Sequence, residues 1–397
     1  MSINNYRILS NPAWIAAIIT IIVIIITAQI FLLEPRTFFS KGVPYTRYNN
    51  YTIFKQSYFH LIGNKDLYQP YPEKHNDYYK YSPSFSLMFF ALAYLPDEIG
   101  LFLWNLLNAL VLFFALWKLP FKSDRTRLLM LGMILIELLT TIRNSQSNGL
   151  IAGMIVFAFL FLEKKQTALA SLFIVLTVFI KIFGLVALSL FMLYPNKVKA
   201  IIYTCCWMFL LAILPLTVIS FSQLSYLYHS WLALLQNDHD TSYGLSVAGW
   251  LNSWFGMESK NAIVLIGAAL FCLPFLNHKY FHELRYRLFY LSSVLIWIVI
   301  FNHKAESPTF VLAVCGVAIW YFSQQLKTEN VVLLLLTLVF TVLSPTDLFT
   351  RSFRDSYVIP YVLKAVPCIL VWIKICYDLI FYKTENNDLI AGNSYDH

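Results

Sequence analysis

The sequence predicts an all-α polytopic integral membrane protein, and three observations carry that prediction. Hydrophobic residues make up 59% of the 397 positions, charged residues only 13%, and the mean hydropathy is +0.64. A soluble domain would carry roughly twice that share of charged residues. Stretches of about 20 apolar residues, the length that crosses a hydrocarbon core of roughly 30 Å, recur from residue 13 almost to the end of the chain. The pattern fits about twelve transmembrane helices.

The first apolar stretch, residues 13–33, is expected to be a retained membrane anchor. It is too long for the core of a signal peptide, and no small-x-small cleavage pattern precedes Glu34. The N-terminus, near Arg7, is then cytoplasmic. All six cysteines lie inside apolar stretches without CxxC spacing, so they predict neither a disulfide framework nor a zinc site.

The remaining predicted spans follow at short intervals, and the basic residues between them set the orientation. Connections assigned to the cytoplasm carry more Lys and Arg than those assigned to the outside, as the positive-inside rule requires. We expect one domain over residues 1–382 and a short polar cytoplasmic tail over 383–397, in a multi-pass protein of the cell membrane with both termini cytoplasmic. The spans after the anchor cover residues 99–119, 128–142, 149–162, 167–180, 182–194, 200–221, 261–276, 288–301, 307–322, 331–345 and 357–382.

Segment 82–95 is also apolar, but it breaks this alternation if it crosses the membrane. Its short length and the flanking Pro83 and Pro96 favour a re-entrant or juxtamembrane segment. The polar regions 34–98 and 222–260 are then long outer loops. Function is expected in these loops and at the outer ends of the helices.

The two outer loops combine aromatic and charged residues. Lys80 and Tyr81 belong to such a mixture in the first loop, which suits a cleft for a sugar or a lipid headgroup. An interfacial aromatic belt explains the same composition, because Tyr and Trp concentrate at membrane boundaries. In the second loop, Asp238, His239 and Asp240 are expected to be solvated rather than to bind a metal. The sequence indicates no cofactor and leaves a divalent cation open.

Isolated cations near outer helix ends are candidates for binding an anion. Lys181 interrupts an apolar run and has no acidic neighbour in sequence, so it needs an anion or a path to water. Snorkelling to the outer headgroups is the simpler alternative. Arg143, beside Gln146 and Asn148, has the same two interpretations, a contact to a donor headgroup or a surface anchor.

A compact polar run separates two apolar segments at residues 302–308. It places His303, Lys304 and Glu306 close together at a depth where ionisable groups are costly unless they are used or paired. His303 and Lys304 are therefore predicted to neutralise a leaving phosphate. The alternative is a short solvated loop in which Lys304 pairs with Glu306.

Several short motifs follow one another in order along most of the chain. Asn49-Asn50-Tyr51 leads to Gly63-Asn64-Lys65-Asp66-Leu67-Tyr68, and Tyr79-Lys80-Tyr81-Ser82-Pro83 precedes Leu103-Trp104-Asn105. Asn144-Ser145-Gln146-Ser147-Asn148-Gly149 and the lone Lys181 follow. In these motifs the chain resembles the polyprenol-phosphate-sugar-dependent glycosyltransferases of family 87, within the C-type superfamily of membrane glycosyltransferases. That family has a Leu-Tyr turn, a Tyr-x-Pro-Pro stretch, a Leu-Trp helix, a Gln-x-Asn turn and a lysine at the corresponding places.

One departure from the family concerns the catalytic base. The family usually carries an aspartate at the start of the first outer loop, where this sequence has Asn49 and Asn50. A neutral amide cannot take the proton that an acceptor hydroxyl loses in an inverting transfer. Another carboxylate must replace it, and Glu34 and Asp66 are favoured. The remaining outer-face candidates are Asp77, Asp238, Asp240 and Glu306.

The resemblance implies an enzyme that moves a sugar, with mannose as the candidate, from a polyprenyl-monophosphate donor to a lipid or glycan acceptor at the outer face. Membrane lipids are further partners, and the net charge of +8 reflects topology and acidic headgroups rather than nucleic-acid binding. A transporter or flippase of lipid-linked sugars and a non-catalytic scaffold stay as alternatives. We expect phosphate binding by Lys181, Arg143, Lys304, Gln146 and Asn148, catalysis by His303, Glu306 and Glu34 or Asp66, and a cleft at Lys80 and Tyr81.

Overall fold

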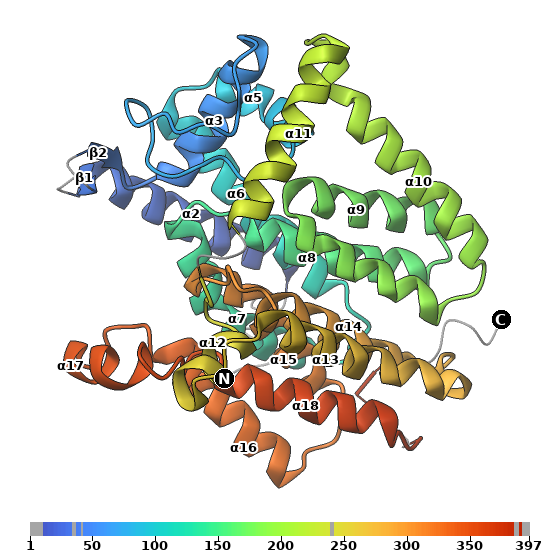
Figure 1. The fold of residues 1–397 in the computed structure, drawn as a ribbon. Helices are drawn as coiled ribbons and strands as arrows, with labels where there is room; N and C mark the ends of the chain where they lie inside the picture. The colour runs from blue at the N-terminus through green and yellow to red at the C-terminus, as the bar shows by residue number, and fades with distance from the viewer. Residues whose placement is uncertain (1–10, 34–36, 41–42, 239–241, 385–388, 391–397) are drawn as a thin grey trace.

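The computed structural model describes residues 11–33, 37–40, 43–238, 242–384 and 389–390. Their regular structure is almost entirely helical, with one antiparallel pair of strands, β1 (Thr37–Ser40) and β2 (Val43–Thr46) (Figure 1). The 3-10 and π-helical segments are η1 (Ile182–Leu193), η2 (Leu214–Thr217), η3 (Leu273–Tyr280), η4 (Ser307–Thr309), η5 (Thr337–Leu343) and η6 (Arg354–Val358). The α-helices are α2 (Pro12–Leu32), α3 (Asn49–Ile62), α4 (Pro83–Met88), α5 (Phe90–Ala93), α6 (Asp97–Trp117), α7 (Asp124–Arg143), α8 (Asn148–Glu163), α9 (Thr167–Ile180), α10 (Lys197–Ile213), α11 (Phe221–Asp238), α12 (Val247–Phe255), α13 (Lys260–Cys272), α14 (Leu284–Ile300), α15 (Phe310–Phe322), α16 (Thr328–Leu336), α17 (Arg351–Phe353) and α18 (Val366–Ile380).

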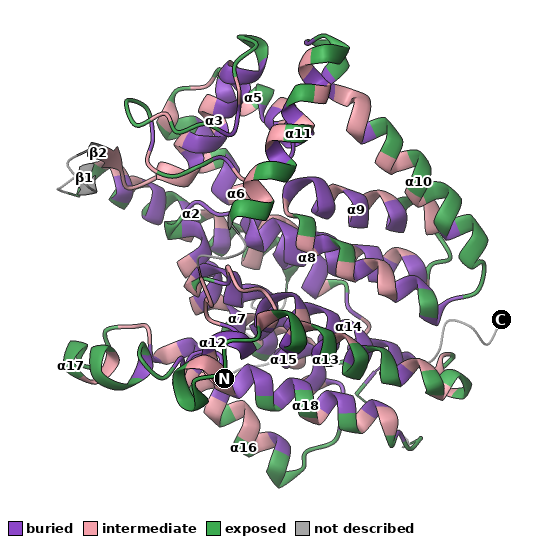
Figure 2. Cartoon of the chain, in the orientation of Figure 1, coloured by how far each residue is buried: buried purple, intermediate pink, exposed green. Residues whose placement is uncertain are grey.

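Helices α8, α14 and α15 form the buried centre of the molecule (Figure 2). α14 packs against α15 and α18, and α8 packs against α6 and α9. At the edge, α10 buries only Ala200 and Leu211, so most of its apolar surface faces outward. Outward-facing apolar helices around a fully enclosed core are the arrangement that a lipid solvent permits, because helices satisfy their own backbone hydrogen bonds.

Each apolar span predicted from the sequence falls on a helix or on a run of short helical segments. Within the described residues, four helices are long and apolar enough to cross a membrane, and five more apolar helices are shorter. The helical membrane fold class is therefore confirmed, whereas the number of about twelve crossings stays a prediction. The four long helices are Pro12–Leu32, Asp97–Trp117, Lys197–Thr217 and Lys260–Tyr280.

Segment 82–95 forms two short helices, α4 and α5, of six and four residues. At a rise of about 1.5 Å per residue, neither reaches across a hydrocarbon core of roughly 30 Å. Ser82 caps α4 by accepting a hydrogen bond from the Phe85 amide, and Pro83 occupies the first turn, where its missing N–H costs nothing. The segment therefore has the size expected for one that does not cross.

Residues 222–260, which were expected to form an outer loop, are largely helical, because α11 and α12 occupy most of that region. In α11 the buried residues Leu224, Leu227 and Trp231 recur at helical spacing. Polar residues such as Ser225 and His229 lie between them and lower the average hydropathy. The sequence of the amphipathic helix α11 was therefore interpreted as a polar loop.

Two buried ion pairs join segments that are distant in sequence. Glu137 of α7 lies 2.7 Å from Lys364, with side chains 1% and 4% exposed. Arg287, at the start of α14, binds Glu163 of α8 through Nε at 2.6 Å and Nη2 at 2.8 Å. The Arg287 side chain is fully buried. Because a buried charge is stable only with a partner, each pair fixes two distant segments relative to each other.

The contact between α6 and α8 depends on Gly153. A Cβ atom at this position would lie 2.8 Å from backbone atoms of Val111 and Leu112, so the two helices approach as closely as glycine allows. We expect Gly153→Ala to lower the unfolding free energy by about 1–3 kcal/mol, because the backbone of α6 must move away. Thermal unfolding in detergent measures this change.

Gly132 of α7 provides the matched control, since a Cβ atom there meets no atom within 4 Å. Gly132→Ala should leave the unfolding temperature unchanged or raise it slightly, because alanine favours helix by about 1 kcal/mol over glycine. If Gly153→Ala and Gly132→Ala had equal unfolding temperatures, α6 and α8 would not be in close contact at Gly153.

Candidate functional site

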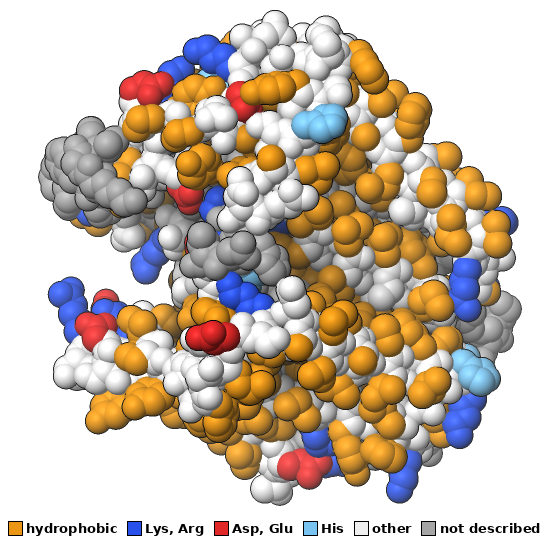
Figure 3. Space-filling model, in the orientation of Figure 1, with side chains coloured by type: hydrophobic (Ala, Val, Ile, Leu, Met, Phe, Trp, Pro, Cys, Tyr) orange, Lys and Arg blue, Asp and Glu red, His pale blue; other side chains and the backbone are white. Residues whose placement is uncertain are grey.

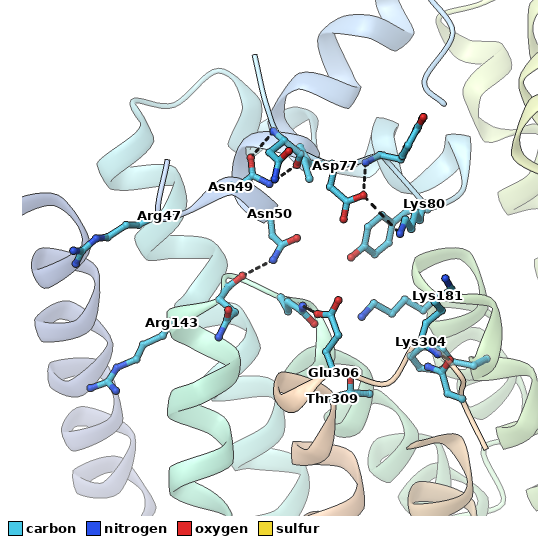
Figure 4. A pocket seen from close by; sticks show the side chains of 18 of the residues that line it. Arg47, Asn49, Asn50, Asp77, Lys80, Arg143, Lys181, Lys304, Glu306 and Thr309 are labelled. Atoms are coloured by element: carbon cyan, nitrogen blue, oxygen red, sulfur yellow. Dashed lines mark hydrogen bonds and ion pairs between the residues drawn. The ribbon is translucent and has the colours of Figure 1, made fainter. Parts of the chain in front are cut away.

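A cavity of about 1100 Å³ brings together segments from the whole length of the chain. Its walls come from the end of α2, the start of α3, the loop before α4, the turn between α7 and α8, the α9–η1 junction and the segment after α14. The surface of the molecule is hollowed beside basic side chains (Figure 3), and the cavity's polar residues converge in Figure 4. The polar and charged lining residues include Arg47, Asn49, Asn50, Asn76, Asp77, Lys80, Tyr81, Arg143, Asn144, Gln146, Lys181, His303, Lys304, Glu306 and Thr309.

A chain of hydrogen bonds runs along one wall of this cavity. The Lys181 ammonium donates to Asn148 Oδ1 at 2.8 Å, and Asn148 Nδ2 donates to Gln146 Oε1 at 2.6 Å. Gln146 Nε2 in turn donates to Glu306 Oε2 at 2.9 Å. Four residues that the sequence analysis singled out are thus joined across three helical elements. Asn148 is buried and does not line the cavity, so it acts by orienting Lys181 and Gln146.

Lys181 stands where α9 ends and η1 begins. It has an extended backbone conformation and donates its amide to the Thr177 carbonyl. Ser82 Oγ donates to the neighbouring Phe179 carbonyl at 2.6 Å, so the loop before α4 closes the exposed end of α9. Burial lowers the pKa of Lys181 to about 8, an effect opposed by the carboxylate of Glu306 and increased by Lys80.

The segment after α14 is a tight turn that presents His303, Lys304 and Glu306. Glu306 caps η4 in a reciprocal arrangement with Thr309, and Asn302 Oδ1 accepts from the Lys304 amide at 2.9 Å. Gly244, at φ +58°, lets its loop pass directly under this turn, since a Cβ atom there would lie 2.4 Å from the His303 carbonyl oxygen. All three predicted residues line the cavity.

Asn49 and Asn50 both line the cavity, and both side chains bind backbone groups. Asn49 Oδ1 accepts from the Asn76 amide at 2.9 Å while Asn49 Nδ2 donates to the Asn76 carbonyl at 2.5 Å. Asn50 Nδ2 donates to the Asn144 carbonyl at 2.8 Å. The two amides therefore hold the first loop and the α7–α8 turn in place.

Lys80 and Tyr81 line the cavity as predicted. The Lys80 ammonium lies 3.7 Å from Asp77 Oδ1, and the Lys80 carbonyl accepts from Trp231 Nε1 of α11 at 3.1 Å. The ring of Tyr81 lies 6.0 Å from the Lys181 ammonium. Helix α11 thus fixes the backbone that carries these two residues.

Arg143 is exposed at the C-terminal end of α7 and lines the cavity away from Lys181. Figure 4 shows it beside Arg47, toward α2, while Lys181 and Lys304 lie on the other side of Glu306. Arg143 and Lys181 therefore lie in different parts of the cavity. A single anionic group bound by Lys181 is not also bound by Arg143.

Of the two carboxylates favoured as base, Glu34 lies outside the described residues, and Asp66 does not line the cavity. Asp66 is displaced from the site because it ties its loop to α11, accepting from Ser230 Oγ at 2.9 and 3.0 Å and from the Tyr226 hydroxyl at 3.0 Å. It does not line the cavity, so Asp66 is a structural residue in this fold.

The residues considered for a metal site in segment 222–260 fall outside the described part of the chain. His239 and Asp240 lie outside the described residues, as does the side chain of Asp238. Elsewhere in the described chain, no group of three His, Cys, Asp or Glu residues is placed to hold a metal ion.

The cavity is positively charged on balance and apolar on part of its wall. Arg47, Lys80, Arg143, Lys181 and Lys304 face two carboxylates, Asp77 and Glu306, among the described lining residues. Arg47 and Asn76 stand in no motif, so the sequence does not predict them as site residues. The apolar lining is not predicted either, because it comes from helical spans that look alike in sequence. Its residues are Ile26, Ile30, Leu33, Ile182, Phe183, Trp297, Ile298 and Phe301.

Comparison with known proteins supports the resemblance noted in the sequence. The model of glycosyltransferase family 87 matches residues 79–345, well over half of the chain. The matched region contains Lys80, Gln146, Lys181 and Glu306, whereas Asn49 lies before it. No curated protein matches the chain.

Proposed function

This chain belongs to glycosyltransferase family 87, and from that premise we propose that it moves a sugar from a polyprenyl-monophosphate donor to a lipid or glycan acceptor at the outer face of the cell membrane. Membership makes it a membrane glycosyltransferase. The donor, the acceptor, mannose as the sugar, inversion at the anomeric carbon and the cytoplasmic termini are parts of the proposal.

The observation that carries the proposal is the union of a cationic wall and an apolar wall in one cavity. Lys181 and Lys304 offer positive charge to a phosphate, and the apolar lining from α2 and α14 offers a surface to a hydrocarbon chain. A soluble nucleotide-sugar would gain nothing from the second wall. A sugar linked through phosphate to a polyprenyl chain uses both.

The leaving group defines what these cations do. As the bond between the anomeric carbon and the phosphate oxygen breaks, negative charge grows on that oxygen. Lys181 is already oriented by Asn148, and Lys304 and His303 face the same cavity. Charges fixed in advance stabilise such a transition state without reorganisation. Glu306 holds the wall together through Gln146 and moderates the charge around Lys181.

Transfer of radiolabelled sugar tests the proposal. Purified protein in proteoliposomes is given synthetic polyprenyl-phosphate mannose, glucose or arabinose, with a lipid extract as the acceptor. A labelled product from one donor is the expected result. Movement of labelled donor between leaflets without product would instead favour a transporter of lipid-linked sugars. If the protein neither forms product nor moves the donor, a non-catalytic scaffold is the remaining alternative.

A further inference from the structure

The loop that faces Asn49 carries a carboxylate directly beside the point where Asn49 binds. Asn49 bonds both the amide and the carbonyl of Asn76, and Asp77 is the next residue. An aspartate in place of Asn49 could accept from the Asn76 amide but would repel the Asn76 carbonyl. The amide at position 49 is therefore the residue type that this clamp requires.

Asp77, next to this clamp, has an unusual backbone conformation. Its φ is +82°, which side-chain-bearing residues rarely adopt and which persists only where surrounding contacts impose it. Those contacts are present, because the Asp77 carbonyl lies 3.0 Å from His75 Nδ1 and Asp77 Oδ1 accepts from the Tyr78 amide at 2.7 Å. Non-glycine residues held in this way concentrate at functional sites.

Asp77 and Glu306 are the two carboxylates that line the described part of the cavity. They differ in the contacts that their side chains make. Glu306 accepts from Gln146 and caps the Thr309 amide, on the wall that also carries Lys181. Asp77 projects from the facing wall in Figure 4, where its Oδ1 lies 3.7 Å from the Lys80 ammonium, and its side chain is 55% exposed. In an inverting transfer, the base and the leaving group work on opposite faces of the sugar. Asp77 stands on the side opposite Lys181 and Glu306.

We propose that Asp77 is the general base of this enzyme and that Asn49 positions it, so that the loop before α4 supplies the carboxylate that is absent from the start of α3. The inference rests on the proposed function. Asp77 takes the proton of the acceptor hydroxyl while that oxygen forms a bond to the anomeric carbon. The bond to the phosphate oxygen breaks with its electron pair, releasing polyprenyl phosphate, and Asp77 later returns the proton to water.

The first test compares Asp77→Asn with Glu73→Gln, an exposed carboxylate in the same loop that does not line the cavity. Asp77→Asn should lower kcat at least about 10²-fold, the usual contribution of a general base. Stabilisation of the protein by added polyprenyl phosphate should persist, because the phosphate side is intact. Glu73→Gln should behave as the unmodified protein does.

The second test separates position from chemistry. Asn49→Ala should lower kcat with little change in the donor KM, and Asn50→Asp should restore part of the activity of Asp77→Asn by returning a carboxylate to the start of α3. Transfer that survives in Asp77→Asn would overturn the assignment of the base alone. Failure of the unmodified protein to transfer any sugar would overturn the assignment together with the proposed function.

Discussion

Replacing Lys181 by methionine is expected to lower kcat/KM for the proposed lipid-phosphate donor by about 10²- to 10³-fold, the usual loss when one fixed donor to a developing oxyanion is removed. Methionine keeps the length of the side chain but neither its charge nor its hydrogen bond to Asn148. Steady-state transfer measurements with a series of donor concentrations test this expectation. Lys74→Met, at an exposed position of the first loop outside the cavity, is the matched control and should retain full activity.

The pH dependence of the same variants distinguishes charge from packing. With a pKa of about 8, Lys181 loses its positive charge as the pH rises past that value, so kcat/KM of the unmodified protein should fall on the alkaline side. Lys181→Arg keeps its charge at every accessible pH and should remove this fall, even if its basal activity is lower. An alkaline limb that is identical in the two proteins would contradict the role of Lys181.

Breaking the buried pair between Glu137 and Lys364 should have the largest effect on stability. Lys364→Met leaves the Glu137 carboxylate buried without its counter-charge, which typically costs 3–5 kcal/mol, so about that loss of unfolding free energy is expected. Thermal or denaturant unfolding in detergent measures the loss. The double variant Glu137→Met with Lys364→Met should recover most of it, because an apolar pair of similar volume avoids the desolvation of both charges.

A partly exposed ion pair serves as the control for that experiment. Glu329 lies 3.2 Å from Lys374 with 61% of its side chain exposed. Glu329→Gln should change the unfolding free energy by less than about 1 kcal/mol, because solvent already screens the pair. If Lys364→Met were as mild as Glu329→Gln, the buried pair would not hold α7 to the segment before α18.

Much of the fold could be predicted because the bilayer imposes one rule on every helix. Apolar length alone located the stretches that became α2, α6 and α14. Apolar length did not predict α11, whose apolar face is only a stripe along the helix. It also did not predict the ion pair between Glu137 and Lys364, which both lie inside apolar spans. Pairing between positions far apart in sequence leaves no local trace.

The site residues that could be predicted are those that stand in short motifs or are isolated charges. Gln146, Lys181 and Glu306 were selected from short motifs and isolated charges, and the structure joins them in one hydrogen-bonded chain. Asp66 had the right residue type but the wrong surroundings, because Ser230 and Tyr226 of α11 already bind it. Which carboxylate faces a cavity depends on how loops fold back, and hydropathy does not encode this.

The ion pair between Glu137 and Lys364 can form only late in the synthesis of the chain. The two residues are separated by 227 positions, so at 5–20 residues per second the ribosome needs roughly 11–45 s to supply the second after the first. Throughout that interval α7 carries an acid with no counter-charge inside a membrane. A helper at the site of insertion that shelters α7 until α18 arrives would therefore raise the yield of folded enzyme, and a chain that stops before residue 364 would be left for proteolysis.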